Sequence, residues 1–402
     1  MFTSTKSLIL ACSFVVICLV LLAVLIRAIL NIKESLEIRD SASSRGISLY
    51  QSSALQDAST AYSSGDNPEK DNTPKGMEIN SIRCTLILLV ILIHCTPFKD
   101  AYPAMQNAIL AFVVPLFLFI TGYLFNVDKT WRQFGQYLWT MTMMYAIFET
   151  AYTILSYFFP VRDGIDVLSL GAVVERLLLH PIGPYWYLHT MIICGGVYYL
   201  SHRVCSRLGS ANAMTWTLLM AVALSYYTPL LSLSSPLAFF AGVAVRRRYW
   251  EFGGIFKGSA ASSIIAIMTV AYAVCTNKEY ATQLSYFSIV LGICVVEFTV
   301  WYTRRMDGTL SRAIAYIGAN TLPIYLLHPI FTLLSKRLLH DMVENGNILC
   351  FCIITLSSAV AGSIAIGRLM DRAGLSRLLF RKNMMRQPRH TASTSIYEIS
   401  RK

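Results

Sequence analysis

Two ionisable residues lie eleven positions apart in the otherwise almost wholly apolar run 81–98. Arg83 stands near its start and His94 near its end. Eleven helical residues make about three full turns and advance about 16 Å, so both side chains are expected on one face. Such residues are costly in hydrocarbon and are usually kept for function. An arginine fork can bind phosphate, and a neutral histidine can accept a hydroxyl proton.

Further ionisable residues interrupt other apolar runs, namely Glu149, His189, Glu297 and His328. Each of them could instead be a structural residue paired with a neighbouring helix. The segment around His328 is unusually polar for an apolar run, with Thr321, Pro323 and Tyr325 close by. A proline inside a membrane span frees a backbone carbonyl and often lines a cavity. This segment is therefore expected to face the interior of a bundle.

Several kinds of site are not supported by the sequence. It has no HExxH motif, no histidine pair at i, i+4, no Walker A loop, no GxGxxG and no GxSxG. A metal site, ATP hydrolysis and dinucleotide binding are therefore unsupported. The ten cysteines are scattered, mostly in apolar runs, without a CxxC pair. We expect them to be small buried hydrophobic residues rather than a disulfide framework.

The composition indicates a membrane protein. Hydrophobic residues make up 55% of the 402 residues and charged residues only 14%, against about 25% charged in soluble proteins. Several apolar runs approach the length that a spanning helix needs. The predicted fold is an all-α, polytopic transmembrane helical bundle, with ten core helices plus one N-terminal anchor helix. The predicted core spans are 81–98, 103–125, 134–159, 185–201, 213–231, 234–246, 260–276, 284–302, 313–335 and 347–367.

Four regions are predicted along the chain. Residues 1–32 hold the anchor, whose uncharged run is Leu8 to Ile26, and residues 33–76 form a polar, flexible linker. Residues 77–368 form the membrane domain, and residues 369–402 form a basic tail. With the linker placed in the cytoplasm and alternating helices, most of the 34 Lys and Arg residues fall on the cytoplasmic side.

This charge distribution predicts the orientation. The Arg83 end of the first core helix and the C-terminus are expected in the cytoplasm, with His94 towards the far leaflet. The net charge of +12 is then explained by topology and by attraction to anionic lipid, so no nucleic-acid partner is expected. The lipid bilayer is the partner that the composition requires.

Five segments, in order, carry a family resemblance: the Arg83–His94 spacing, Phe117–Tyr123, Pro184–Leu188, Ala238–Gly242 and Gly318–Pro329. From about Met77 to Arg368 the chain resembles the integral membrane acyltransferase-3 family of bacterial sugar O-acyltransferases. It departs from the family pattern at two places. Asn80 stands where an acidic residue usually precedes the arginine, and Lys129 and Arg132 stand where paired arginines are frequent.

The resemblance implies transfer of an acyl group, most often acetyl, from cytoplasmic acyl-CoA to a sugar hydroxyl. The acceptor would be a surface glycan or its lipid-linked precursor, and the protein would lie in the bacterial cytoplasmic (inner) membrane. Acyl-CoA would be the donor substrate, with no permanently bound cofactor. Arg83, Lys129 and Arg132 would contact CoA phosphates, and His94 would be the catalytic base. Trp186, Tyr325 and His328 would line the acceptor side or orient His94.

Two other functions remain open from the residues themselves. One is a transporter or flippase that uses intramembrane His and Glu side chains as proton-relay groups. The other is a sensor that keeps the fold and has lost catalysis. Inverted repeats and matched pairs of Gly/Pro-broken helices are typical of transporters, and the sequence shows neither.

Overall fold

The computed structural model describes residues 74–158, 161, 163–207, 213–228, 230–248, 252–276, 285–306 and 308–386. These residues form α-helices and one short 3-10 helix, η2, and contain no strand. The predicted N-terminal anchor and the linker up to residue 73 lie outside the described residues. The helices are α3 Pro74–Ile93, α4 Thr96–Ala101, α5 Pro103–Leu124, α6 Trp131–Phe158, α7 Leu170–Leu178, η2 Gly183–Tyr185, α8 Trp186–Arg207, α9 Ala213–Tyr227, α10 Ser234–Arg248, α11 Phe252–Ile255, α12 Ala261–Thr276, α13 Tyr286–Thr303, α14 Gly308–Ala319, α15 Thr321–Leu338, α16 His340–Glu344, α17 Ile348–Arg372 and α18 Leu375–Phe380.

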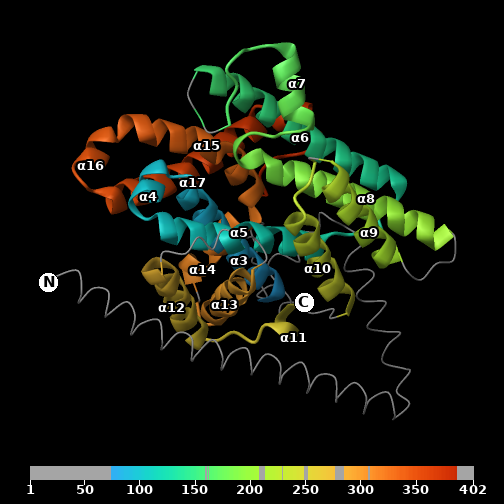
Figure 1. Ribbon diagram of the computed structural model, residues 1–402, viewed down its shortest axis with the longest axis horizontal. Helices are drawn as coiled ribbons and strands as arrows, with labels where there is room; N and C mark the ends of the chain where they lie inside the picture. Colours follow the sequence, from blue (N-terminus) through green and yellow to red (C-terminus); the bar gives the residue numbers. More distant parts are fainter. Residues whose placement is uncertain are drawn as a thin grey trace, which may run out of the picture.

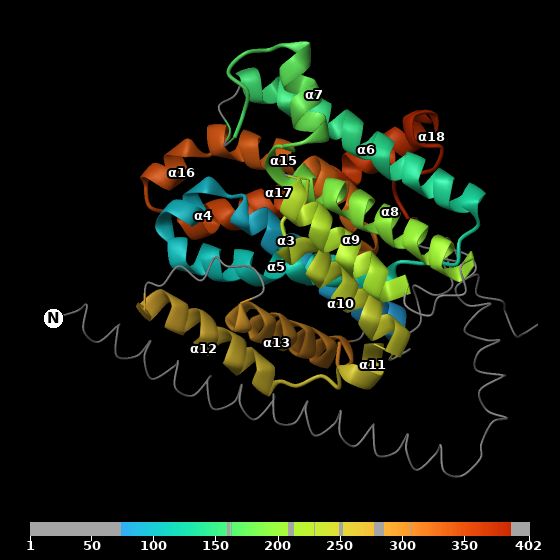
Figure 2. The same cartoon turned by 45° about the vertical axis from the view of Figure 1, so that its right-hand side comes forward.

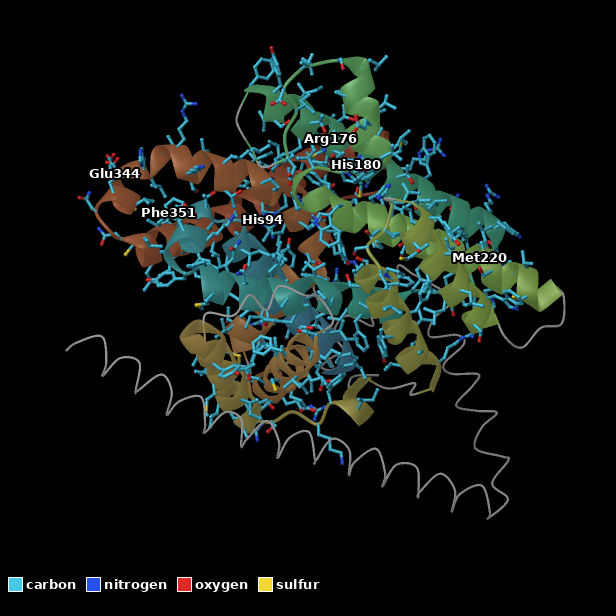
Figure 3. The ribbon with its side chains drawn as sticks, viewed as in Figure 1. His94, Arg176, His180, Met220, Glu344 and Phe351 are labelled. Carbon is cyan, nitrogen blue, oxygen red and sulfur yellow. The ribbon has the colours of Figure 1, made fainter. Side chains whose placement is uncertain are left out.

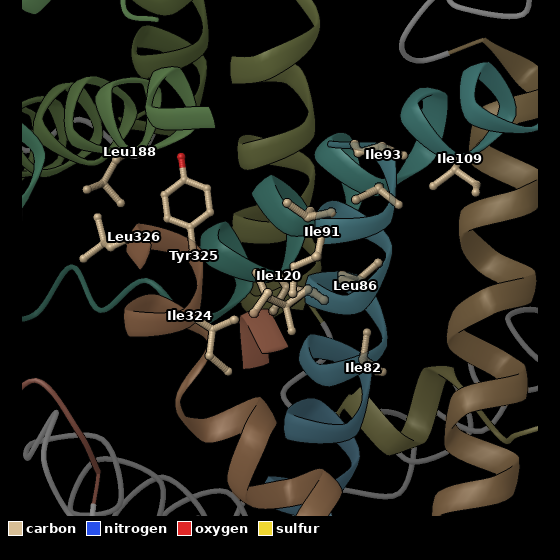
Figure 4. Close-up of a cluster of buried hydrophobic side chains, with 14 of the residues drawn as sticks. Ile82, Leu86, Ile91, Ile93, Ile109, Ile120, Leu188, Ile324, Tyr325 and Leu326 are labelled. Carbon is tan, nitrogen blue, oxygen red and sulfur yellow. The ribbon is translucent and has the colours of Figure 1, made fainter. Parts of the chain in front are cut away.

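Helix α3 lies in the middle of the molecule in both ribbon views (Figures 1 and 2). It contacts α5, α13, α14, α15 and α17. A helix that is apolar on every side is expected to be surrounded by other helices. Ile82, Leu86, Ile87 and Ile91 accordingly have no exposed surface. In Figure 4 the side chains of α3 share a cluster with Ile324 and Tyr325 of α15.

Glycines bring pairs of helices into close contact. A Cβ on Gly122 of α5 would lie 1.9 Å from the Phe239 carbonyl oxygen, and one on Gly242 of α10 would lie 1.9 Å from the Phe119 oxygen. The two helices therefore pack through reciprocal glycine contacts, as small residues allow in membrane bundles. This contact gives a packing role to the glycines of two segments that carry the family resemblance.

The predicted span 313–335 is not one helix. It is broken between α14 and α15, which meet at an angle of 82°. The cause is Pro323, whose ring would clash with the carbonyl of residue 319 four positions earlier if the helix continued. Helix α14 ends at Ala319, and Pro323 then stands in the first turn of α15, where its missing N–H is tolerated.

Each of the ten predicted core segments contains helix in the described part of the chain, the ninth as this bent pair. Three helices there are long and apolar enough to cross a membrane, Gly76–Ile93, Pro103–Leu124 and Ile348–Arg372, and the bent pair would make a fourth. The chain is thus an all-α membrane bundle, while the number of crossings remains a prediction. The start of the predicted tail is folded, because Asp371 accepts hydrogen bonds from the Met384 and Met385 N–H groups at 2.7 and 2.9 Å.

Candidate active site along helix α3

Arg83 lies at the junction of α14 and α15. Its Nη2 donates a hydrogen bond of 2.6 Å to the Oγ1 of Thr321, the first residue of α15. The first turn of a helix has N–H groups without intrahelical partners and carries partial positive charge. Asn320 does not cap this turn, because its side-chain oxygen accepts from the Arg386 N–H at 2.7 Å. Arg83 and the start of α15 therefore form a positive site that suits a phosphate or carboxylate.

Glu78, the acidic residue nearest to Arg83 in sequence, pairs with a different arginine. The Glu78 carboxylate pairs with Arg304 at 2.7 Å, and the remaining Arg304 donors reach the Lys257 and Phe256 carbonyls at 2.8 and 3.3 Å. Asn80, which replaces the family's usual acid, is buried where α14 crosses α3. A Cβ on Gly318 would lie 1.7 Å from the Asn80 carbonyl oxygen. Thr321 is thus a polar partner that orients the Arg83 guanidinium.

Hydroxyl groups continue from Arg83 into the bundle. Tyr187 of α8 lies within electrostatic range of Arg83. Its hydroxyl lies 2.5 Å from the Thr121 Oγ1, and its ring centroid lies 5.5 Å from that of Tyr325. Thr121 and Tyr187 were not among the predicted site residues, because uncharged hydroxyls in apolar runs carry little signal. Their position within segments that carry the family resemblance was the available indication.

His94 lies at the other end of α3, one residue beyond its last helical residue. The predicted helical run 81–98 breaks here, because Pro97 would clash with the Ile93 carbonyl if the helix continued. The His94 N–H still reaches the Val90 and Ile91 carbonyls at 3.3 and 3.1 Å, so the residue stays on the last turn. Its side chain is exposed, although it stands within the bundle (Figure 3).

His328 contacts His94 from α15. The two ring centroids are 5.3 Å apart and the planes are tilted by 44°. His328 is completely buried, and its Nδ1 lies 2.8 Å from the Tyr325 carbonyl oxygen. Since a carbonyl only accepts, this contact places the proton on Nδ1 and a lone pair on Nε2. The Nε2 has no hydrogen-bond partner among the described residues. His94 is therefore the ring of this pair that a hydroxyl substrate can reach.

Helix α15 is joined to the η2 turn before α8 by hydrogen bonds from tyrosine hydroxyls to backbone carbonyls. The Tyr325 hydroxyl donates to the Pro184 carbonyl, and the Tyr185 hydroxyl donates to the Leu326 carbonyl at 2.8 Å. On the other side, the buried Glu149 carboxylate accepts from the Ile182 N–H at 2.7 Å. Tyr325 is thus engaged in holding the η2 turn. Trp186, the next residue after the turn, is half-buried and lines a pocket.

Lys129 and Arg132 stand between α5 and the first turn of α6. The Lys129 Nζ lies 4.2 Å from the centre of the Tyr137 ring, and its carbonyl accepts from the Tyr199 hydroxyl at 2.7 Å and from Arg203. Arg132 is exposed and forms no hydrogen bond to a described residue. The structure thus holds Lys129 in place by ring and backbone contacts and leaves Arg132 on the surface. Their role in phosphate binding stays a prediction.

Metal chemistry has no candidate donor set in the described part of the chain. No three His, Cys, Asp or Glu side chains come together there as metal ligands. The polar groups of the site are instead an arginine, hydroxyls and a histidine pair.

The chain matches a known protein family. A family model described as an acyltransferase domain matches residues 78–368, from Glu78 in α3 to Arg368 in α17. The matched range contains Arg83, Thr321, His94 and His328. No match was found among curated proteins or among solved structures.

Proposed function

Because the chain belongs to the acyltransferase family whose domain covers residues 78–368, we propose that it is an O-acyltransferase acting across the bacterial inner membrane. The donor is cytoplasmic acyl-CoA, with acetyl as the first candidate, and the acceptor is a sugar hydroxyl of a surface glycan or its lipid-linked precursor. One observation carries the proposal. Arg83 and His94 lie at opposite ends of α3, and each contacts a polar residue of α15.

The Arg83 end supports binding of the donor. CoA carries phosphates, and a guanidinium can hold a phosphate through two parallel N–H groups. The uncapped start of α15 adds backbone N–H groups and positive helix-end charge at the same place. Lys129 and Arg132 would add further phosphate contacts near the cytoplasmic end. The pantetheine arm would then follow α3 towards His94, past the hydroxyls of Tyr187 and Thr121.

The His94 end supports the chemical step. The acceptor hydroxyl oxygen attacks the thioester carbonyl carbon, and His94 accepts the hydroxyl proton. The carbon–sulfur bond then breaks, the CoA thiolate leaves, and it takes the proton from His94 to become CoA thiol. The products are the sugar ester and free CoA. His328 positions the His94 ring from its buried side, and Tyr325 holds the turn that presents Trp186 to the acceptor.

A transfer assay tests this function. Membranes containing the protein are incubated with acetyl-labelled acetyl-CoA, and label in the extracted glycan is counted. We expect His94→Ala to lower transfer at least about a thousandfold, the upper part of the range for removal of a general base. His340→Ala is the matched control, because that histidine is exposed on α16 and pairs there with Glu344 rather than with a site residue. Transfer by His94→Ala at the wild-type rate, with equal protein level, would refute the role of His94.

The same membranes distinguish the transporter hypothesis. A proton gradient is imposed across vesicles made from these membranes, and solute uptake is measured in parallel with label transfer. Label in glycan without coupled uptake supports the acyltransferase. Coupled uptake without transferred label supports proton relay by the buried His and Glu residues.

A further inference from the structure

A polar pocket of about 420 Å³ lies at the His94 end of the bundle. Its wall is formed by the α6–α7 connection, the end of α7 and the residues that follow it, the start of α8 and the α9–α10 connection. The residues that matter for its chemistry are Asp163, Arg176, Trp186, His189 and Ser232. Its volume falls in the range of small-molecule sites, about 300–1,000 Å³. Figure 3 shows Arg176 and His180 near each other at this end of the molecule.

The η2 turn connects the pocket to the proposed active site. Trp186 follows directly after Tyr185, whose hydroxyl bonds to the Leu326 carbonyl two residues before His328. The pocket also lies on the side predicted to face away from the cytoplasm, opposite Arg83. It is therefore on the side from which an acceptor glycan would arrive.

Arg176 is a charged group in this pocket with hydrogen-bonding capacity available for a ligand. Its side chain is half-buried, and its guanidinium forms no hydrogen bond or ion pair with a described residue. Its link to Glu149 is electrostatic only, and the Glu149 Oε1 is already bonded to the Ile182 N–H. His180, by contrast, pairs with Glu175 at 3.5 Å. A guanidinium has five N–H donors in a rigid fork, which matches a carboxylate or a phosphate.

The other lining groups suit a sugar ring. The indole of Trp186 offers a flat apolar surface with a polar edge. His189 lies near the Leu178 carbonyl, and a neutral imidazole has one nitrogen that donates and one that accepts a hydrogen bond, so the ring can bind a sugar hydroxyl. Ser232 adds a hydroxyl from the α9–α10 connection, and this hydroxyl also contacts the Ser234 and Ser235 hydroxyls at 3.2 and 2.8 Å. An aromatic surface with hydroxyl partners and one arginine fork fits a sugar that carries an acidic group.

We propose that this pocket binds one sugar unit of the acceptor and that this unit carries a carboxylate or a phosphate held by Arg176. The inference rests on the proposed function, since it assigns the pocket to the acceptor of that reaction. It names the substrate class as an acidic glycan or a phosphate-linked sugar precursor. The hydroxyl that receives the acyl group belongs to a neighbouring part of the same molecule.

Binding to the full chain in nanodiscs tests the proposal without any acyl donor. The probes are glucuronate, galacturonate and mannuronate, the corresponding hexose 1-phosphates, and the neutral hexoses. The binding of each probe is measured by saturation-transfer NMR. We expect at least one acidic probe to bind about tenfold more tightly than its neutral hexose, as a charge-assisted hydrogen bond gives. Better binding by the uronates would identify a carboxylate, and better binding by the sugar phosphates would identify a phosphate.

Two variants test whether Arg176 causes the preference for acidic probes. Arg176→Gln should abolish the preference for the acidic probe, while Arg337→Gln, an exposed arginine on α15, should keep it. Equal melting temperatures would show that both variants fold. The proposal is overturned if no acidic probe binds better than its neutral hexose, or if Arg176→Gln keeps the preference.

The transfer assay separates the two proposals. Binding of an acidic probe without any transferred label would refute the proposed function and leave the pocket standing. Transferred label with an acceptor KM that Arg176→Gln does not change would refute the pocket assignment alone.

Discussion

At the scale of residues, Arg83 makes a contact that depends on the shape of its side chain. Its guanidinium donates to Thr321 and has further N–H groups in the same plane. Lysine keeps the charge and loses the planar fork. We expect Arg83→Lys to raise the KM for acyl-CoA about tenfold, with little change in the KM for the acceptor. Arg312→Lys, an exposed change on α14, serves as the control. A wild-type titration curve for Arg83→Lys would refute bidentate phosphate binding.

Thr321 provides a separate test of how Arg83 is oriented. Valine keeps the shape of threonine and removes the oxygen that accepts from Arg83 Nη2. A hydrogen bond to a charged group contributes about 1.5–3 kcal/mol. We therefore expect Thr321→Val to raise the KM for acyl-CoA about tenfold or more and Thr321→Ser to restore it. If valine and serine gave the same KM, another group would have to orient the arginine.

The sequence allowed part of this site to be predicted. Arg83 and His94 could be found because ionisable side chains in apolar runs are costly and therefore conspicuous. The partner of Arg83 could not, since Thr321 lies 238 positions along the chain and only the fold brings them together. Tyr187 and Thr121 are neutral and stand in apolar segments, so nothing marked them as polar neighbours of Arg83. The pocket with Arg176 was not predictable either, because its lining residues come from three inter-helix connections and the adjoining ends of α7 and α8, which only the fold brings together.

At the scale of elements, two prolines set where the site residues lie. Pro97 ends α3 at Ile93, and Pro323 ends α14 at Ala319, four positions earlier in both cases. The first break leaves His94 exposed at the end of α3. The second creates the uncapped start of α15 beside Arg83. The apolar runs predicted helices at both places, and hydrophobicity does not fall at either proline, so the breaks were missed.

The close crossing of α14 over α3 gives a stability prediction. Gly318→Ala would place a Cβ about where the Asn80 carbonyl oxygen stands, so the helices must separate. We expect a loss of about 1–3 kcal/mol, typical of overpacking, seen as a lower melting temperature in detergent. The matched control is Gly135→Ala on α6, which meets no atom within 4 Å and should be neutral or slightly stabilising. Equal melting temperatures for the two variants would mean that α14 can shift without cost.

At the scale of the whole molecule, the polar groups lie at two ends. One end, where α3 and α15 begin, contains Arg83, the Glu78–Arg304 pair and the contact between Asn320 and Arg386. His94, His328 and the Arg176 pocket lie towards the opposite end. A donor and an acceptor could therefore approach from different sides and meet along α3. The proposed function requires the start of α3 to face the compartment that holds acyl-CoA.

Labelling from one side tests that requirement. Single cysteines are introduced at Asp166, exposed before α7, or at Arg132, exposed at the start of α6, in a Cys350→Ser background that removes an exposed thiol. Because the distribution of Lys and Arg predicts a cytoplasmic α6 start, an impermeant maleimide should label Asp166→Cys in intact spheroplasts. Arg132→Cys should react only after lysis, and the background alone gives the blank. The reverse pattern would place Arg83 away from cytoplasmic acyl-CoA, and the direction of transfer proposed for α3 could not hold.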